Sequence, residues 1–68
     1  MTAVARVTKI TAASSKSFQG AVDEGLSRAS KTLRGISGLE VISQKAKVED
    51  GKITEYRATI EITFILEG

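Results

Sequence analysis

The sequence predicts a small α+β fold: a single β-α-β-β unit in which a three-stranded antiparallel sheet packs on one helix. Two observations predict it, an apolar stripe of helical period in the first half and a long β-hairpin over Leu39–Leu66 in the second. A strand-helix-strand crossover leaves its two strands parallel, and the hairpin partner runs antiparallel to them. The simplest sheet therefore has the order 1-3-2, with the last strand central. We expect residues 1–68 to form one domain.

The first half of the chain is predicted to hold one strand and the helix. Ala3–Thr11 is rich in β-branched residues, which favours a strand, and the serines that follow offer oxygens to cap a helix without indicating which one does so. The stripe itself consists of Phe18, Ala21, Val22, Gly25, Leu26, Ala29 and Leu33. Gly20 and Gly25 either permit close packing or are merely tolerated. Gly35 suits the left-handed position after a helix, so we expect the helix to end near Arg34.

The hairpin is predicted to close at Asp50-Gly51, a dipeptide that readily adopts the positive φ angles of a two-residue type I′ turn. Folding at this turn places Val41 opposite Ile60, and it places Gln44 opposite Arg57. The last strand alternates between an apolar side and a polar side. A slip by one residue would move the apolar side into water, so this pairing is strongly specified.

One helix covers only one face of such a sheet, which leaves the other face without cover inside the chain. The uncovered face is predicted to carry Glu40, Ile42, Gln44, Arg57, Thr59, Glu61 and Thr63. A domain of this size buries only about 60% of the surface that its unfolded chain exposes. The chain has no Cys or His, which excludes disulfides and the usual zinc sites. We therefore expect self-association, with the uncovered face as an interface or a ligand surface.

Several functional classes are disfavoured by the composition. Without His or Cys, no spacing of residues indicates a nucleophile with its base, so we expect no enzyme activity. The net charge is only +2 and the two Phe residues lie on core faces, which argues against nucleic-acid binding. No apolar run approaches the roughly 20 residues of a membrane span. Because residues 1–6 lack the pattern of a signal peptide, we expect a cytoplasmic location.

Glu40 and Glu61 stand directly opposite each other in the predicted register, an arrangement that destabilises a sheet unless the charges are compensated. Water can screen them, or a cation from the first strand, Arg6 or Lys9, can neutralise them. Alternatively they share a hard cation such as calcium, which prefers oxygen ligands. Both explanations stay open.

Taken in order, several segments of the chain resemble the dodecins, small bacterial and archaeal proteins with a strand-helix-strand-strand fold. The segments are Lys16-Ser17-Phe18, Ala29-Ser30-Lys31-Thr32-Leu33, Val48-Glu49-Asp50-Gly51-Lys52-Ile53, Glu55-Tyr56 and Phe64-Ile65-Leu66-Glu67. The resemblance implies a hollow homo-dodecamer that binds and stores flavins without catalysing a reaction.

The resemblance also implies which residues form the ligand site. In typical dodecins a tryptophan at the start of the second strand stacks on the flavin ring, and the matching position here is Gly38. A glutamine of the third strand hydrogen-bonds the ring edge, and its position is Arg57, which can donate but cannot accept. A flavin (FMN, FAD or riboflavin) would then bind at Gly38, at Arg57 and at its expected cross-strand neighbour Gln44.

Dodecins that lack the tryptophan include a calcium-binding type, which this chain also resembles. In that case Glu40 and Glu61 would be the metal ligands. Three hypotheses follow: a flavin-type storage assembly, a calcium-binding assembly, and a structural assembly in which Arg57 neutralises Glu61 across a subunit interface.

Overall fold

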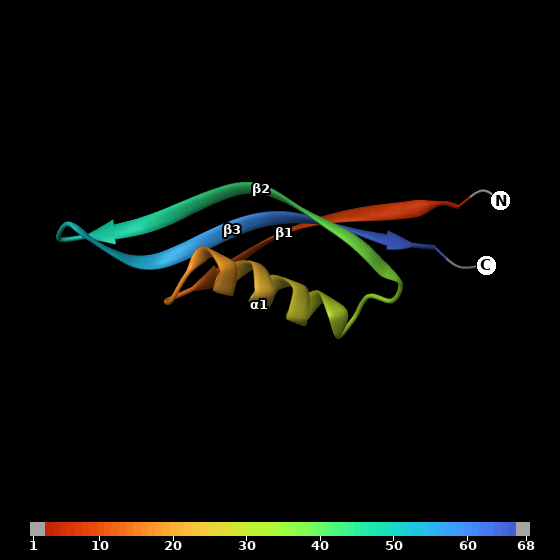
Figure 1. The fold of residues 1–68 in the computed structure, drawn as a ribbon, viewed down its shortest axis with the longest axis horizontal. Coiled ribbons are helices and arrows are strands. Elements are labelled where there is room, and N and C mark those ends of the chain that lie inside the picture. The colour runs from red at the N-terminus through yellow and green to blue at the C-terminus, as the bar shows by residue number, and fades with distance from the viewer. Residues whose placement is uncertain (1–2, 67–68) are drawn as a thin grey trace.

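The computed structural model describes residues 3–66 and has the predicted order of elements, β1 (Ala5–Ser14), α1 (Phe18–Ser30), β2 (Ile36–Glu49) and β3 (Lys52–Ile65). The strands form one sheet in the order β1-β3-β2, and β3 runs antiparallel to both neighbours. The predicted α+β fold is therefore confirmed. Met1 and Thr2 at one end, and Glu67 and Gly68 at the other, lie outside the described residues. In Figure 1 the helix lies along one side of the twisted sheet.

A serine caps the start of helix α1, and another serine is its last residue. The side chain of Ser17 accepts a hydrogen bond from the backbone N–H of Gly20 at 2.8 Å, so Ser17 is the capping serine. The helix ends at Ser30, four residues before the predicted end at Arg34. The backbone N–H groups of Lys31 and Thr32 donate to the carbonyls of Arg28 and Ala29, and these i→i−3 bonds tighten the last turn and end the helix. Gly35 has the expected positive φ of 73°, but it lies in the turn into β2.

The core lies between α1 and the central strand. Its buried residues are Ala21, Ala29, Ala58, Ile60 and Ile62, with Ile10, Val22, Leu33, Ile36 and Leu39 packed around them. Gly25 explains how the helix approaches so closely, because a Cβ there would lie 3.0 Å from Cδ1 of Ile60 and 3.2 Å from Cβ of Ala12. Close packing is thus the reason for this glycine, and the apolar side predicted for β3 is the side that the helix covers.

The hairpin closes as predicted, with positive φ at both Asp50 (52°) and Gly51 (75°). Val41 lies opposite Ile60, and Glu40 lies opposite Glu61. The ladder is nevertheless irregular: Ser37 and Ile42 are extra residues on β2, and Thr54 is an extra residue on β3. The extra residues Ile42 and Thr54 offset each other, so the predicted register holds near the turn and in the core and shifts by one residue between them.

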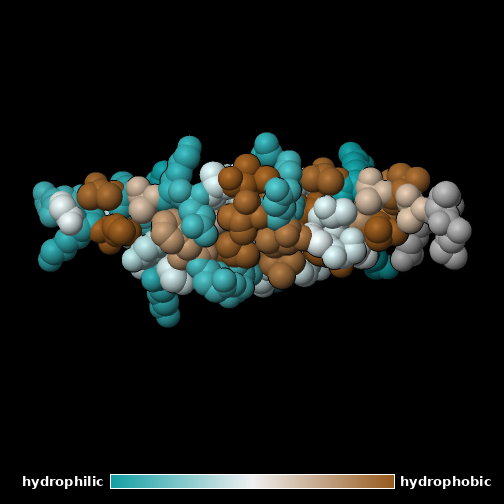
Figure 2. Space-filling view, turned by 45° about the horizontal axis from the view of Figure 1, so that its top comes forward, coloured by the Kyte–Doolittle hydropathy of each residue, from teal (hydrophilic) through white to brown (hydrophobic). Residues whose placement is uncertain are grey.

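Strands β2 and β3 continue past the end of β1 as a two-stranded arm, residues 47–55, which ends at the hairpin turn (Figure 1). The arm makes the molecule elongated, with principal extents of 54 × 20 × 13 Å. Val48 and Ile53 pair across the arm, and they are 60% and 50% exposed. Figure 2 shows apolar side chains at the surface near this end and again near the middle of the molecule. Within residues 3–66, α1 is too short to span a membrane.

Candidate functional site

The sheet face opposite α1, called the uncovered face below, is built from four rows of side chains across the three strands. The paired positions are Val7, Thr63 and Gly38; Lys9, Glu61 and Glu40; Thr11, Thr59 and Ser43; and Ala13, Arg57 and Lys45. Each row takes one residue from β1, one from β3 and one from β2, because residues directly opposite each other in a sheet point to the same side. The face is therefore polar at its centre.

The acidic pair lies where the sequence predicts it. Glu40 and Glu61 are cross-strand partners, and Lys9 lies opposite Glu61 on the other side of β3. Of the two cations expected to neutralise the pair, Lys9 shares its face, whereas Arg6 lies opposite Phe64 on the helix side. Among the described residues no group of three Asp or Glu side chains is placed to hold a metal ion. A cation at this pair would need further ligands.

Arg57 has a different neighbour from the one predicted. Because Ile42 is an extra residue on β2, Lys45 lies opposite Arg57, and Gln44 lies opposite Ala58 on the helix side. The predicted pairing of Gln44 with Arg57 is therefore wrong. The alternation of apolar and polar residues could not show this shift, since an extra residue leaves the composition of the strand unchanged.

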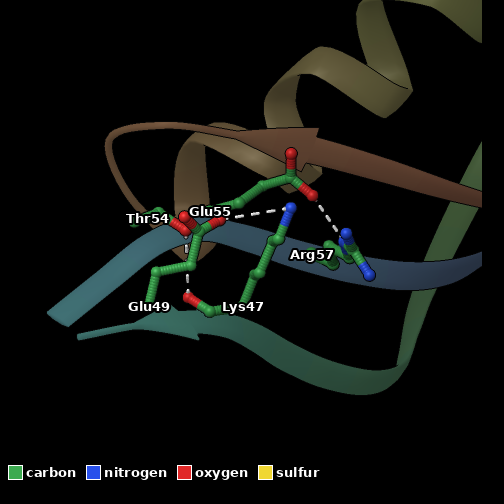
Figure 3. A network of polar contacts seen from close by, with 5 residues as sticks. All are labelled: Lys47, Glu49, Thr54, Glu55 and Arg57. Carbon is green, nitrogen blue, oxygen red and sulfur yellow. Dashed lines mark hydrogen bonds and ion pairs between the residues drawn. The ribbon is translucent and has the colours of Figure 1, made fainter. Parts of the chain in front are cut away.

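The polar side chains of the arm, together with Arg57 beside it, form a small network (Figure 3). Nε of Arg57 donates to Oε1 of Glu55, and Nζ of Lys47 lies 3.3 Å from Oε1 of Glu49. The extra residue Thr54 donates its hydroxyl to the carbonyl of Lys47 at 3.4 Å, which ties the irregular ladder together. These pairs are half-exposed, so each stabilises the fold only weakly.

Gly38 and Arg57 share the uncovered face, as predicted, but they do not meet. Gly38 is paired with Thr63, and the six residues from Thr63 to Arg57 span about 20 Å of extended strand. Gly38 has room for a side chain, because a Cβ there would lie 3.9 Å from Cβ of Thr63 and near nothing else. One chain therefore holds the two predicted ligand contacts too far apart for a single ring.

The uncovered face also lacks an aromatic side chain. The chain has one Tyr, two Phe and no Trp. Tyr56 packs edge to face on Phe18 of α1, with the ring centroids 5.0 Å apart, and Phe64 alternates in phase with the buried Ile62. All three rings lie on the helix side. The residues of the single chain thus fit a flavin only in part: they offer hydrogen-bond donors and no ring to stack on.

A separate groove of about 330 Å³ lies between the free edge of β1 and α1, with Glu24 and Arg28 at its rim. None of the predicted site residues lines it. The residue that sequence reasoning missed on the uncovered face is Lys45, which pairs with Arg57. The one visible signal was the adjacent apolar pair Val41 and Ile42, which interrupts the alternation where the ladder is irregular.

The comparisons with known proteins agree with this fold. The dodecin of Streptomyces coelicolor is 30% identical, with a TM-score of 0.92 over 97% of this chain and 94% of that one. The dodecin of Streptomyces davaonensis is 29% identical, with a TM-score of 0.94 over the whole of both chains. No curated protein matches the sequence.

A third similar structure is the calcium dodecin of Mycobacterium tuberculosis, described as a calcium-chelating antigen with a novel calcium-binding site. It is 32% identical, with a TM-score of 0.81 over 94% of this chain and 91% of that one. The family model described as Dodecin matches residues 4–67. With its β-α-β-β order and its sheet order of 1-3-2, the chain belongs to the dodecin family.

Proposed function

We propose that this protein is the subunit of a hollow homo-dodecamer that binds and stores a small ligand of the flavin type without catalysing a reaction. The observation that carries the proposal is the uncovered face, on which Gly38 and Arg57 are about 20 Å apart along the strands. Positions so far apart contribute to one ligand only when they come from different subunits. The ligand then lies between copies of the chain.

The shape of the single chain supports an assembly. Its radius of gyration is 14.2 Å, whereas a compact chain of this length has about 11 Å. Its accessible surface is 5144 Å², against roughly 4,100 Å² for a compact monomer of its mass. The excess of about 1,000 Å² is comparable to what one partner contributes to a standard interface.

The arm supplies apolar surface for such contacts. One side of the arm carries charged residues, including Lys47 and Glu55, and the other side carries Val48 and Ile53. No part of residues 3–66 covers the apolar side beyond the start of α1 (Figure 1). A neighbouring subunit would bury this pair at a gain of roughly 1.5–3 kcal/mol for each side chain fully removed from water.

The test combines mass and ligand binding. Native mass spectrometry of the purified protein should give twelve times the subunit mass, and titration with riboflavin and FMN should quench their fluorescence. Absence of quenching at micromolar protein would remove flavins from the proposal. A subunit that stays monomeric and folded would remove the assembly. A cytoplasmic location belongs to the same proposal and is tested by cell fractionation.

Calcium binding is the second candidate, because Glu40 and Glu61 face each other and a calcium dodecin is among the similar structures. Two carboxylates are too few for calcium, which takes six to eight oxygens, so neighbouring subunits and water would complete the site. Lys9 opposes it by placing a cation opposite Glu61. If calcium binds, it raises Tm, and Glu61→Gln abolishes the rise while Glu24→Gln on the helix keeps it. An unchanged Tm would exclude this candidate and leave the acidic pair a structural feature.

A further inference from the structure

The ladder between β2 and β3 has a second way to pair along its irregular stretch. Two cross-strand pairs bound this stretch, Val41 with Ile60 and Val48 with Ile53. Between these pairs each strand contributes six residues, 42–47 on β2 and 54–59 on β3, and they form only five pairs because Ile42 and Thr54 are extra residues. A regular ladder of six pairs would join the same two strands and keep the partners at both ends.

Burial does not decide between the observed ladder and the regular one. Residues 42–47 of β2 are exposed, apart from the half-buried Ser43. Register is weakly specified where a strand buries neither face. β2 is an edge strand, so a slide of one residue along β3 leaves the pairing of β3 with β1 and the packing of α1 on these two strands in place.

The ion pairs of this region do not depend on the register (Figure 3). Lys47 and Glu49 lie on one strand, and so do Glu55 and Arg57, so each pair survives a slide of β2. The hydrogen bond that crosses between the strands here, from the hydroxyl of Thr54 to the carbonyl of Lys47, is long at 3.4 Å. The network therefore holds the observed ladder only weakly.

The cross-strand charges do not choose a ladder either. In the structure Lys45 lies opposite Arg57, which is repulsive, and Lys47 lies opposite Glu55, which is attractive. In the regular ladder Gln44 would take the place opposite Arg57, and both lysines would move to the other face of the sheet. The slide thus removes one repulsive pair and one attractive pair.

The slide changes which face carries the apolar pair of the arm. Side chains alternate along a strand, so pairing the extra residue of each strand turns the end of the hairpin over. Val48 and Ile53 stay partners in both ladders, but they move from the helix side to the side of the uncovered face. They are 60% and 50% exposed in the single chain, so a contact that buries them on the helix side stabilises one ladder and not the other.

We propose that this stretch is a register switch: β2 slides by one residue between the observed ladder and the regular one, and burial of Val48 and Ile53 by a neighbouring subunit holds the observed ladder. The existence of two ladders follows from the single chain. The holding contact rests on the proposed assembly.

Engineered disulfides trap each ladder, since the chain has no cysteine of its own. Arg57→Cys is combined with Lys45→Cys, its partner in the observed ladder, or with Gln44→Cys, its partner in the regular ladder only; Gln44 and Arg57 now point to opposite faces, which prevents a disulfide without sliding. Gln44→Cys with Thr63→Cys, partners in neither ladder, is the matched control. With oxidised glutathione as the oxidant, we expect both Arg57→Cys variants to close within the chain and the control to stay reduced. Closure of the Lys45→Cys variant alone would overturn the switch.

Hydrogen exchange on the unchanged protein gives an independent readout. Sliding breaks the hydrogen bonds of residues 43–47 to β3, whereas residues 39–41 of the same strand keep their partners. Amides of residues 43–47 should therefore exchange faster. Equal protection of the two ranges would overturn the inference even if the cysteine variants failed to fold.

The holding contact has its own test. Adding Val48→Lys and Ile53→Lys to both Arg57→Cys variants should raise the yield of the disulfide to position 44 relative to that to position 45. An unchanged ratio would overturn the holding contact and leave the two ladders standing. A monomeric subunit would overturn the proposed assembly and the holding contact together, whereas the trapped disulfides would still decide whether two ladders exist.

Discussion

Replacing Gly38 by Trp tests whether a missing ring limits flavin binding. The structure accommodates the change, because a Cβ at this position meets only Cβ of Thr63, at 3.9 Å, and Gly38 is not one of the glycines with positive φ. Tryptophan is also favoured in strands. Gly38→Trp therefore adds an aromatic plane to a face that has none, with little cost to the sheet.

The expected gain follows from the energy of stacking. One base stacked on an aromatic side chain is worth about 1–3 kcal/mol, which corresponds to a roughly 5-fold to 150-fold tighter complex. The gain should be the same for riboflavin and FMN, because the ring is common to both. Fluorescence titration of the variant beside the unchanged protein measures it.

Gly38→Ala is the matched control, since it adds the Cβ without the ring. We expect its flavin affinity to equal that of the unchanged protein. If Gly38→Trp assembles normally and binds flavin no more tightly than Gly38→Ala, the reasoning that a missing ring limits flavin binding is refuted.

Three further predictions concern stability and assembly. Ser17→Ala removes the helix cap and should destabilise the fold by about 1 kcal/mol, seen as a lower Tm, whereas Ser15→Ala, outside the cap, leaves Tm unchanged. Gly25→Ala forces a Cβ to 3.0 Å from an isoleucine side chain of β3; the overpacking cost of about 1–3 kcal/mol outweighs a helix gain of about 1 kcal/mol, so a raised Tm would contradict it. Replacing both Val48 and Ile53 by Lys should yield smaller assemblies in native mass spectrometry, and an unchanged mass would show that the arm makes no apolar subunit contact.

The sequence predicted most of the fold because its strongest signals are local or periodic. The Asp50-Gly51 turn and the alternation of the last strand led to the correct pairing of Val41 with Ile60. The helix was predicted four residues too long, because Gly35 was interpreted as its cap and the tightened last turn at Lys31 and Thr32 has no signature in the sequence. Local chemistry of this kind decides where elements end.

The candidate site was predicted less completely than the fold. Glu40 and Glu61 were correctly paired, since they lie on the core side of the extra residue Ile42. The predicted partner of Arg57 was wrong, because this pair lies beyond Ile42, where the register is shifted by one residue. A site that depends on which side chains face each other is thus sensitive to a single extra residue, whereas burial of the apolar side is not.

The two opposite offsets at Ile42 and Thr54 also decide which side chains meet across the stretch between them. The strands meet in one register beside the helix and again at the turn, so the stretch between them can change its pairing on its own. If Ile42 and Thr54 were both paired regularly, Gln44 would take the place of Lys45 opposite Arg57. A neutral amide would then replace a cation. The residue opposite Arg57 is therefore set by these two irregularities and not by the packing of the core.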